Sequence, residues 1–96
     1  MAALRFLPQA YEDLRKLDEY HVMNGGRAPF PSDAVLDKVA LLETYPLSGP
    51  IHQDRVLASR DFRKLLAGRW AVIYRVEDDG VVIYRVFHQR SNYVAS

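Results

Sequence analysis

The most regular hydrophobic pattern in the chain lies in its last third, between Arg60 and Tyr93. Three apolar runs rich in β-branched and aromatic residues occur there, separated by Ala67-Gly68 and by Asp78-Asp79-Gly80. Short runs of this kind, divided by turn residues, are typical of an antiparallel meander. The pattern therefore predicts three consecutive strands on which the rest of the chain packs.

The last two runs predict a hairpin. Asp79-Gly80 is a strong turn signal, because a two-residue primed turn needs positive φ angles, which Asp tolerates and Gly adopts freely. The flanking runs 70–76 and 81–87 are apolar on both faces, as expected for central strands that helices cover on at least one side. Arg75 and Arg85 interrupt them. These arginines either pair with carboxylates or point toward an open face where a partner binds.

The N-terminal third predicts a strand and an amphipathic helix. Residues 3–7 form a short apolar segment, suited to an edge or second-row strand, and Pro8 stands where a helix can begin. The spacing of Ala10, Leu14, Leu17 and His21 marks one apolar face, and charged residues that include Glu12 and Asp13 fill the other. Asn24-Gly25-Gly26 ends the helix.

A second helix follows a chain reversal at residues 27–31. Ser32 offers an N-cap hydroxyl for this helix, and Pro46 ends it. Its expected buried face comprises Val35, Leu36, Val39, Leu42 and Tyr45. Residues 47–58 form a loop that leads into the meander.

The order of elements predicts an α+β fold: an N-terminal strand, an antiparallel helical hairpin, then a three-stranded antiparallel meander. The hairpin packs on one face of the sheet, so the opposite face is either solvated or used. Residues 1–96 form a single domain, since no repeat or linker divides the chain.

Composition narrows the class of protein. Hydrophobic residues make up 49% of the chain, which indicates a globular fold, and the absence of cysteine excludes a disulfide scaffold. No apolar run approaches the length of a membrane span or signal peptide, so we expect a soluble, cytoplasmic protein without membrane contact.

The two halves of the chain differ in charge. Residues 1–54 carry five Lys/Arg against eight Asp/Glu, a net −3, whereas residues 55–96 carry eight against four, a net +4. The basic half is the predicted sheet. Such an asymmetry favours an acidic partner, although it is also compatible with an ordinary solvated surface.

None of the three histidines is spaced from another histidine or from a carboxylate as metal ligands usually are, so no metal site or cofactor is predicted. His21 is expected to pack in the helix stripe and His52 to be exposed. His88 directly follows a strand and lies close in sequence to Arg90 and Tyr93, which makes it the one histidine with candidate chemistry.

These groups could serve a metal-free ribonuclease. Such an enzyme needs a base for the 2′-hydroxyl, a cation for the phosphorane and an acid for the leaving oxygen. His88 or Tyr93 could transfer protons, and three arginines could neutralise phosphate: Arg63, Arg85 and Arg90. Alternatively, Arg63 and Arg85 bridge carboxylates of the sheet or loops.

Five blocks of the chain resemble, in the same order, the RelE/ParE superfamily of bacterial type II toxins. The blocks are Arg5 to Leu14, Leu41 to Pro46, Phe62 to Arg69, Val72 to Asp79 and Arg85 to Arg90. The likeness covers nearly the whole chain, and the run from Phe62 to Arg90 is the most specific. The fold that this resemblance implies is the same helical hairpin and meander that the hydrophobic pattern predicts.

The superfamily divides by function. RelE-like members cleave messenger RNA on the ribosome, whereas ParE-like members poison DNA gyrase. RelE-like members usually carry a catalytic arginine where this chain has Ala71, and Arg69 would lie on the same face of an extended strand two positions earlier. The segment 87–90 resembles the ends of ParE-like toxins.

The resemblance therefore favours a ParE-like toxin that inhibits gyrase by protein contact, with no catalytic residue. The expected target-binding residues are Arg63, Arg85, His88, Gln89, Arg90 and Tyr93. The alternative is a metal-independent, ribosome-dependent endoribonuclease that uses Arg69 or Arg63, Arg90, and His88 or Tyr93. In a third possibility the chain has lost toxicity and persists as an antitoxin-binding partner. All three imply a hetero-oligomer with a cognate antitoxin.

Overall fold

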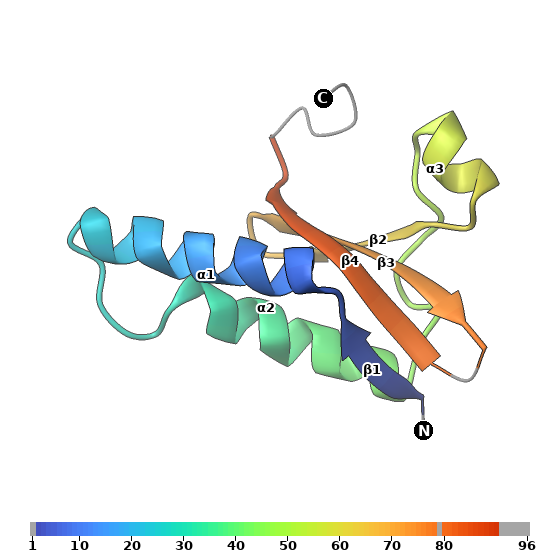
Figure 1. Ribbon diagram of the computed structural model, residues 1–96, viewed down its shortest axis with the longest axis horizontal. Helices are drawn as coiled ribbons and strands as arrows, with labels where there is room; N and C mark the ends of the chain where they lie inside the picture. Colours follow the sequence, from blue (N-terminus) through green and yellow to red (C-terminus); the bar gives the residue numbers. More distant parts are fainter. Residues whose placement is uncertain (1, 79, 91–96) are drawn as a thin grey trace.

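The chain begins with a strand and a helical hairpin and ends with a meander, in the order that the sequence predicts (Figure 1). The computed structural model describes residues 2–78 and 80–90. The elements are β1 (Ala3–Phe6), α1 (Pro8–Met23), α2 (Pro31–Ala40), the 3₁₀ helix η1 (Leu41–Glu43), α3 (Arg55–Ser59), β2 (Arg63–Ala67), β3 (Trp70–Glu77) and β4 (Gly80–His88). None of these described helices is both long and apolar enough to cross a membrane.

The four strands form one sheet in the order β1-β4-β3-β2. The three-stranded antiparallel meander is confirmed, and β1 lies at the edge, parallel to β4. β1 ends at Phe6, because the next residue, Leu7, is the N-cap of α1. Leu7 still donates its backbone N–H to the carbonyl of Ile83 in β4, at 3.0 Å.

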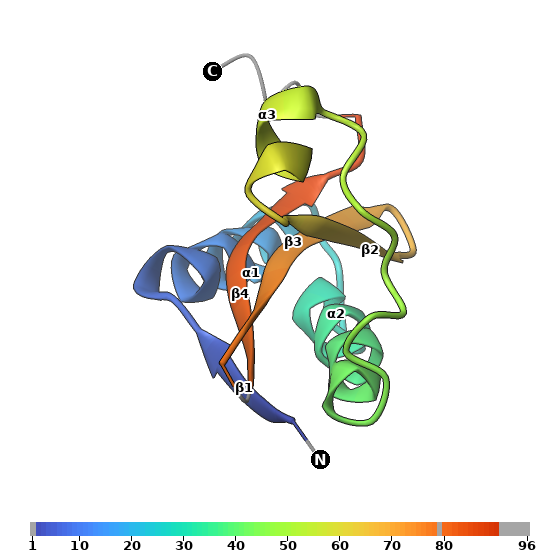
Figure 2. The same ribbon diagram turned by 90° about the vertical axis from the view of Figure 1, so that its right-hand side faces the viewer.

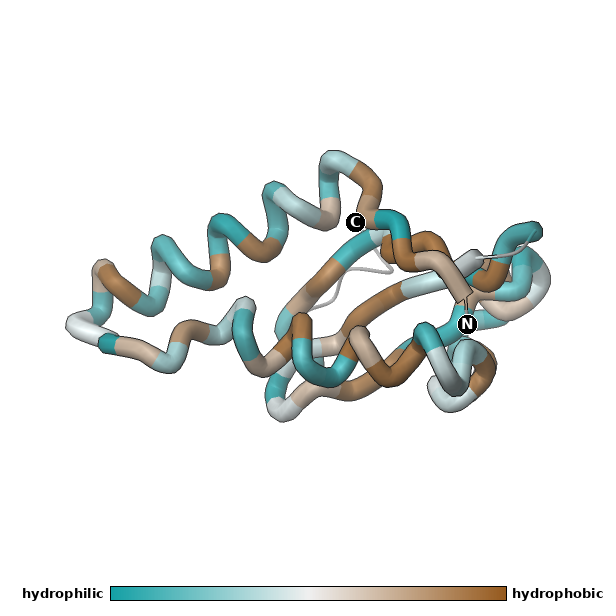
Figure 3. The backbone as a smooth tube through the Cα atoms, turned by 90° about the horizontal axis from the view of Figure 1, so that it is seen from below, coloured by the Kyte–Doolittle hydropathy of each residue, from teal (hydrophilic) through white to brown (hydrophobic). Residues whose placement is uncertain are grey.

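The helical hairpin covers one face of the sheet, and the core lies between the two layers (Figures 1 and 2). Along both helices hydrophobic residues recur between stretches of hydrophilic ones, as expected for amphipathic helices (Figure 3). The core comprises Ala10, Leu14, Val35, Val39, Leu42, Leu65, Ala67, Val72, Tyr74, Val81, Ile83 and Val86.

A β-bulge changes which way β4 side chains point. The register shifts between Ile73 and Tyr74, so that Tyr84 is the extra residue of β4. As a result, Ile83 and Val86 both belong to the core although they are three residues apart. We call the opposite side of the sheet the far face; it carries Lys64, Ala71, Ile73, Arg75, Val82, Tyr84, Arg85 and Phe87.

Aromatic and cationic side chains gather on the far face. The rings of Phe62 and Tyr84 meet edge to face with centroids 4.8 Å apart, and the Arg75 guanidinium lies 5.6 Å from the Phe62 ring. Arg75 also pairs with Glu77 at 3.4 Å, and the Tyr84 hydroxyl donates to the same carboxylate. Of the two alternatives given for Arg75, a carboxylate partner is therefore the one observed.

The first helix follows its prediction at both ends but not on its polar face. Pro8 begins α1, and the chain leaves it through Asn24 and Gly25, whose φ is +77°. His21 is half-buried: its ring packs edge to face on that of Phe30, with centroids 5.9 Å apart, and its Nε2 lies 2.8 Å from the Arg27 carbonyl oxygen. Asp13, which was assigned to the polar face, is instead buried.

The predicted N-cap of the second helix is wrong. Phe30 occupies the cap position, because Pro31, with its fixed φ and missing N–H, suits the first helical turn. Ser32 serves a different purpose: its hydroxyl and backbone N–H both donate to Asp18, at 2.6 and 3.0 Å. Ser32 thus ties α2 to α1.

The second helix also ends earlier than Pro46. After Ala40 the chain tightens into the 3₁₀ turn η1, which turns Leu42 fully into the core. The helical period stops there, so Tyr45 is exposed instead of buried. Leu36 is also exposed, because Val35 and Val39 define the buried face and Leu36 lies beside it.

Residues 47–58 are more ordered than a simple loop. They include α3, which Asp54 caps by accepting backbone N–H bonds from Val56 and Leu57, each at 3.0 Å. The helix stands at the end of the molecule away from the N-terminus (Figure 2).

His52, which was expected to be exposed, is buried. It lies on a short segment along the edge of β2, where its backbone N–H donates to the Phe62 carbonyl at 2.9 Å. Its Nδ1 accepts the backbone N–H of Asp54 at 3.0 Å. Burial lowers the pKa of His52 below its ordinary value of 6.5; Lys64 acts in the same direction and Asp54 opposes it.

The predicted turn between β3 and β4 is wrong in one position, because Gly80 was assigned to it. Glu77 pairs with Gly80, so Gly80 already takes part in the strand pairing, and Asp78 has a φ of 49°. Gly80 belongs to β4, where a Cβ would lie 3.0 Å from the Ala3 carbonyl oxygen. The close approach of β1 therefore explains the glycine; Asp79 lies outside the described residues.

The Tyr74 hydroxyl holds the segment around Gly49. It accepts the Gly49 N–H and lies 2.9 Å from the Pro46 carbonyl, and both Tyr74 and Gly49 are buried. Replacing Tyr74 with Phe leaves these backbone groups unpaired, so urea denaturation should give a free energy of unfolding lower by about 1–3 kcal/mol. The control Tyr84→Phe, at a half-buried site, should cost less than about 1 kcal/mol. Equal losses in both variants would contradict this role of Tyr74.

The burial of His52 makes stability depend on pH. The pKa of His52 is lower in the folded protein than in the unfolded chain, so near pH 6.5 the unfolded chain binds a proton here more readily. Folding stability should therefore fall as the pH decreases from about 7.5 to about 5.5. Thermal denaturation midpoints of wild type and His52→Gln across this range provide the measurement. His52→Gln cannot titrate and should show a flatter dependence; the same slope in both proteins would refute the assignment.

Candidate target-binding site

The residues that follow β4 are fastened to the turn between β2 and β3. Gln89 donates its backbone N–H to the Arg69 carbonyl at 2.8 Å, and its side-chain amide donates to the Gly68 carbonyl. Gly68 permits this tight turn with a φ of +62°. The contact brings Arg69 beside His88, Gln89 and Arg90, and we call these four residues the tail cluster.

His88 is oriented by two contacts. Its ring meets that of Trp70 edge to face, with centroids 5.3 Å apart, and its Nδ1 accepts the backbone N–H of Arg90 at 3.1 Å. An imidazole that accepts at Nδ1 while neutral carries its proton on Nε2. In this arrangement the neutral His88 side chain can donate a hydrogen bond from Nε2.

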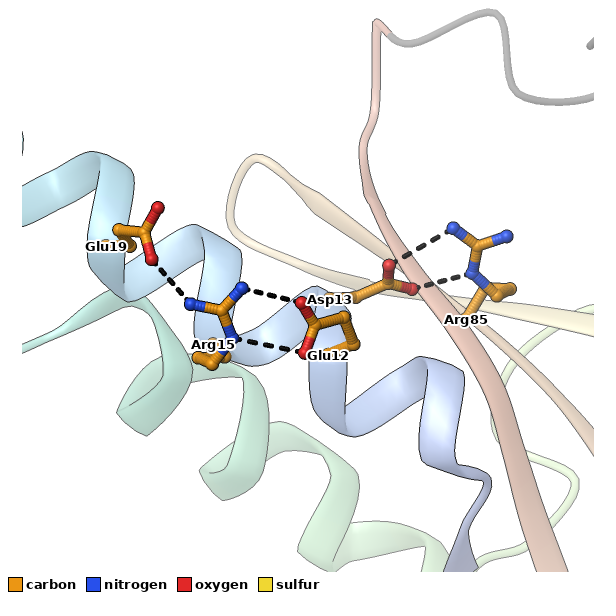
Figure 4. A network of polar contacts seen from close by, with 5 residues as sticks. All are labelled: Glu12, Asp13, Arg15, Glu19 and Arg85. Carbon is orange, nitrogen blue, oxygen red and sulfur yellow. Dashed lines mark hydrogen bonds and ion pairs between the residues drawn. The ribbon is translucent and has the colours of Figure 1, made fainter.

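Arg85 occupies a built ion-pair site at the edge of β4. Its Nε and Nη2 donate to the two carboxylate oxygens of Asp13 at 2.8 and 3.1 Å, which Figure 4 shows. The same carboxylate accepts the backbone N–H of Val86 at 2.9 Å. On its other side the guanidinium lies 4.4 Å from the centre of the Phe87 ring. The carboxylate pairing considered for Arg85 is confirmed.

Arg63 lies apart from the tail cluster. It pairs with Tyr74 in the sheet, whereas Trp70 pairs with His88, so roughly 13 Å of strand separates the two positions. Its guanidinium donates to the Gly49 carbonyl at 2.8 Å, and no carboxylate of the described residues pairs with it. The carboxylate pairing considered for Arg63 is therefore wrong.

Ala71 stands where the resemblance to RelE-like toxins implies an arginine. Ala71 lies on the far face opposite Phe87 and is 1% exposed. Arg69 lies in the turn before β3, not in an extended strand, so the argument that it shares a face with Ala71 does not hold. No cation replaces the arginine within β3 at this point.

Five of the six predicted site residues are described, and they fall into three places. His88, Gln89 and Arg90 lie together, Arg85 lies nearby on the same strand, and Arg63 is distant. Tyr93 lies outside the described residues. Across residues 2–78 and 80–90, no three His, Asp or Glu side chains gather where they could hold a metal ion.

Two neighbours of the predicted residues were not identified from the sequence. Trp70 was assigned only to a strand, and Asp13 only to a polar face. Asp13 had a detectable signal, because it lies three residues after Ala10 and four before Leu17, the spacing of one helix face. A carboxylate in that position must meet a partner when the face is buried.

One protein-family model matches almost the whole chain. Residues 4–93 match the family model of the ParE toxin of the type II toxin–antitoxin system parDE. A comparison with curated proteins returns no significant match.

Solved structures of similar fold come from several toxin–antitoxin systems. A chromosomal ParDE system from P. aeruginosa superposes with a TM-score of 0.70 at 16% identity, covering 92% of this chain and 96% of that one. The RelBE2 toxin–antitoxin complex of Mycobacterium tuberculosis gives 0.67 at 27% identity, over 91% and 96%. YafQ from E. coli strain BL21(DE3) gives 0.65 at 16% identity, over 93% and 94%. With the family model spanning almost its whole length, the chain belongs to the ParE toxin family of type II toxin–antitoxin systems.

Proposed function

We propose that this toxin inhibits DNA gyrase by protein contact and that a cognate antitoxin neutralises it. The observation that carries the proposal is Ala71. A RelE-like nuclease is expected to have its catalytic arginine here, and a methyl group that is 1% exposed supplies neither charge nor hydrogen bond to a phosphorane. The match of residues 4–93 to the ParE family model supports the same branch.

The contact surface is the tail cluster together with Arg85. Gln89 and Arg90 are exposed and project beyond the last strand, and His88 presents a donor at Nε2. Exposed arginines and polar side chains on a rigid strand end suit recognition of an acidic protein surface. Arg63 and Tyr93 remain candidate contacts, with Arg63 on a separate part of the sheet.

The antitoxin is expected to be an acidic, amphipathic segment. Residues 55–96 carry a net +4, and exposed apolar side chains lie near the edge of the helical layer, among them Leu36, Leu41, Tyr45 and Leu47. A segment that folds as it binds could bury these side chains while its carboxylates pair with the basic sheet. The similar RelBE2 structure is a toxin–antitoxin complex, which supports such a partner. Gyrase as target would set the site of action in the cytoplasm.

The second candidate is a ribosome-dependent messenger endoribonuclease. The Nε2–H of His88 and the exposed Arg69 and Arg90 favour it, because they combine a hydrogen-bond donor with cations that could hold a phosphate in one cluster. Similar solved folds include RelBE2 and YafQ as well as ParDE, so the fold is common to both branches.

A paired assay on toxin freshly separated from its antitoxin tests the two functions. The proposal expects inhibited supercoiling and accumulated DNA cleavage by gyrase, with ribosome-bound messenger left intact. The physical reason is that contact with gyrase requires only a complementary surface, whereas cleavage requires a cation at the scissile phosphate. Messenger cut only when ribosomes are present would reject the gyrase proposal.

The tail cluster can be tested by growth arrest. Arg90→Ala removes an exposed cation of the contact surface and should weaken gyrase inhibition about tenfold and relieve arrest; Tyr93→Ala is expected to act similarly. The control is Arg27→Ala, because Arg27 is also exposed but lies in the loop of the helical hairpin, away from the sheet (Figure 1). Undiminished arrest by Arg90→Ala at wild-type expression would remove Arg90 from the site.

A further inference from the structure

Asp13 is the one buried carboxylate among the described residues, and it binds three donors that belong to neighbouring positions of β4. Two of them come from the Arg85 side chain and one is the Val86 backbone N–H. The exposed salt bridges of Arg15 differ from this one: Arg15 joins Glu12 and Glu19 on the outer surface of α1, where no carboxylate is buried (Figure 4). The Asp13 site is therefore more specialised than a surface ion pair.

The Arg85 side chain is held on two sides and open on a third. Asp13 engages Nε and Nη2, and the Phe87 ring lies against the guanidinium plane. A guanidinium has five N–H groups, so three are left after the two bonds to Asp13, and no other described residue is bound to them. The side chain is 39% exposed, so this outer edge can be reached from solvent.

An arginine fixed in this way is prepared for a second anion. Its planar fork matches a carboxylate in a bidentate geometry, and little side-chain entropy is left to lose on binding. The location agrees with such a role, since β4 runs from Arg85 through Phe87 to its last residue, His88, which Gln89 and Arg90 of the tail cluster follow directly.

We infer that Asp13 is a positioning residue, which holds Arg85 against Phe87 so that the outer edge of the guanidinium binds a carboxylate of the target protein. The inference rests on the proposed function in naming a protein target. Asp13 itself touches no target; it acts through Arg85.

Gyrase inhibition by a series of variants tests this inference. Asp13→Asn and Arg85→Ala should each weaken inhibition about tenfold. The double variant should be no weaker than Arg85→Ala, because the effect of Asp13 on inhibition passes through Arg85. Losses that multiply in the double variant, or wild-type potency in folded Asp13→Asn, would overturn the inference.

The matched control is Asp18→Asn. Asp18 also lies on α1 and also joins two elements, through its bonds to Ser32, but it is remote from β4 in the hairpin. This variant should lose stability while keeping wild-type potency. If potency followed the denaturation midpoint in both Asp variants, Asp13 would have a structural role only, and the inference would fail.

Arg85→Lys covers the case in which Asp13→Asn does not fold. Lysine keeps the positive charge beside Asp13 but lacks the fork, so inhibition should again weaken about tenfold. Wild-type potency of this variant would show that an oriented guanidinium is not needed.

Hydrogen exchange of the Arg85 Nε–H, followed by ¹⁵N NMR, separates this inference from the proposed function. The signal should exchange slowly in wild type and rapidly in Asp13→Asn, whatever the target is. Slow exchange in both proteins would refute the positioning step. If messenger cleavage rather than gyrase inhibition responded to Arg85→Ala, the bound anion would be a phosphate, and the carboxylate assignment would be overturned.

Discussion

β4 lies inside the sheet and needs hydrogen-bond partners along both of its edges. β3 supplies one edge along the whole strand, whereas β1 supplies the other only as far as Ile83. Beyond that point the carboxylate of Asp13 accepts the Val86 N–H, so a helix side chain takes over from a strand. An unpaired backbone N–H at this buried position would cost free energy comparable to a lost hydrogen bond. The Asp13 carboxylate therefore joins α1 to β4 by a polar contact, beside the apolar packing of Ala10 and Leu14.

The bulge at Tyr84 sets the direction of the side chains in the same part of β4. It keeps Ile83 and Val86 in the core while Tyr84 and Arg85 both lie on the far face. In a regular strand with Ile83 toward the helices and Tyr84 on the far face, Arg85 would point toward the helices. The bulge and Asp13 together allow one strand to be apolar toward the helices and to present cations near its end.

The tail cluster is held mainly by backbone contacts. The pairing of Trp70 with His88 and the bond from Gln89 to the Arg69 carbonyl set its position, and neither depends on which target the toxin binds. Under the proposed function, the choice between gyrase and messenger RNA as the target would depend on a few side chains carried by this fold. In this chain those side chains include an alanine at position 71 and cations just outside it.

Local patterns in the sequence determined the elements and their order. β-branched runs specified β3 and β4, Pro8 and Gly25 bounded α1, and the adjacency of His88, Gln89 and Arg90 followed from the chain itself, because each of these effects acts within a few residues. Contacts between distant segments were decided only by the tertiary structure. Asp13 meets Arg85 across 72 positions, and Arg63 binds a backbone carbonyl instead of a carboxylate. Periodicity identifies a buried face, but it does not identify the partner that a buried polar group finds there, since that depends on how the layers pack.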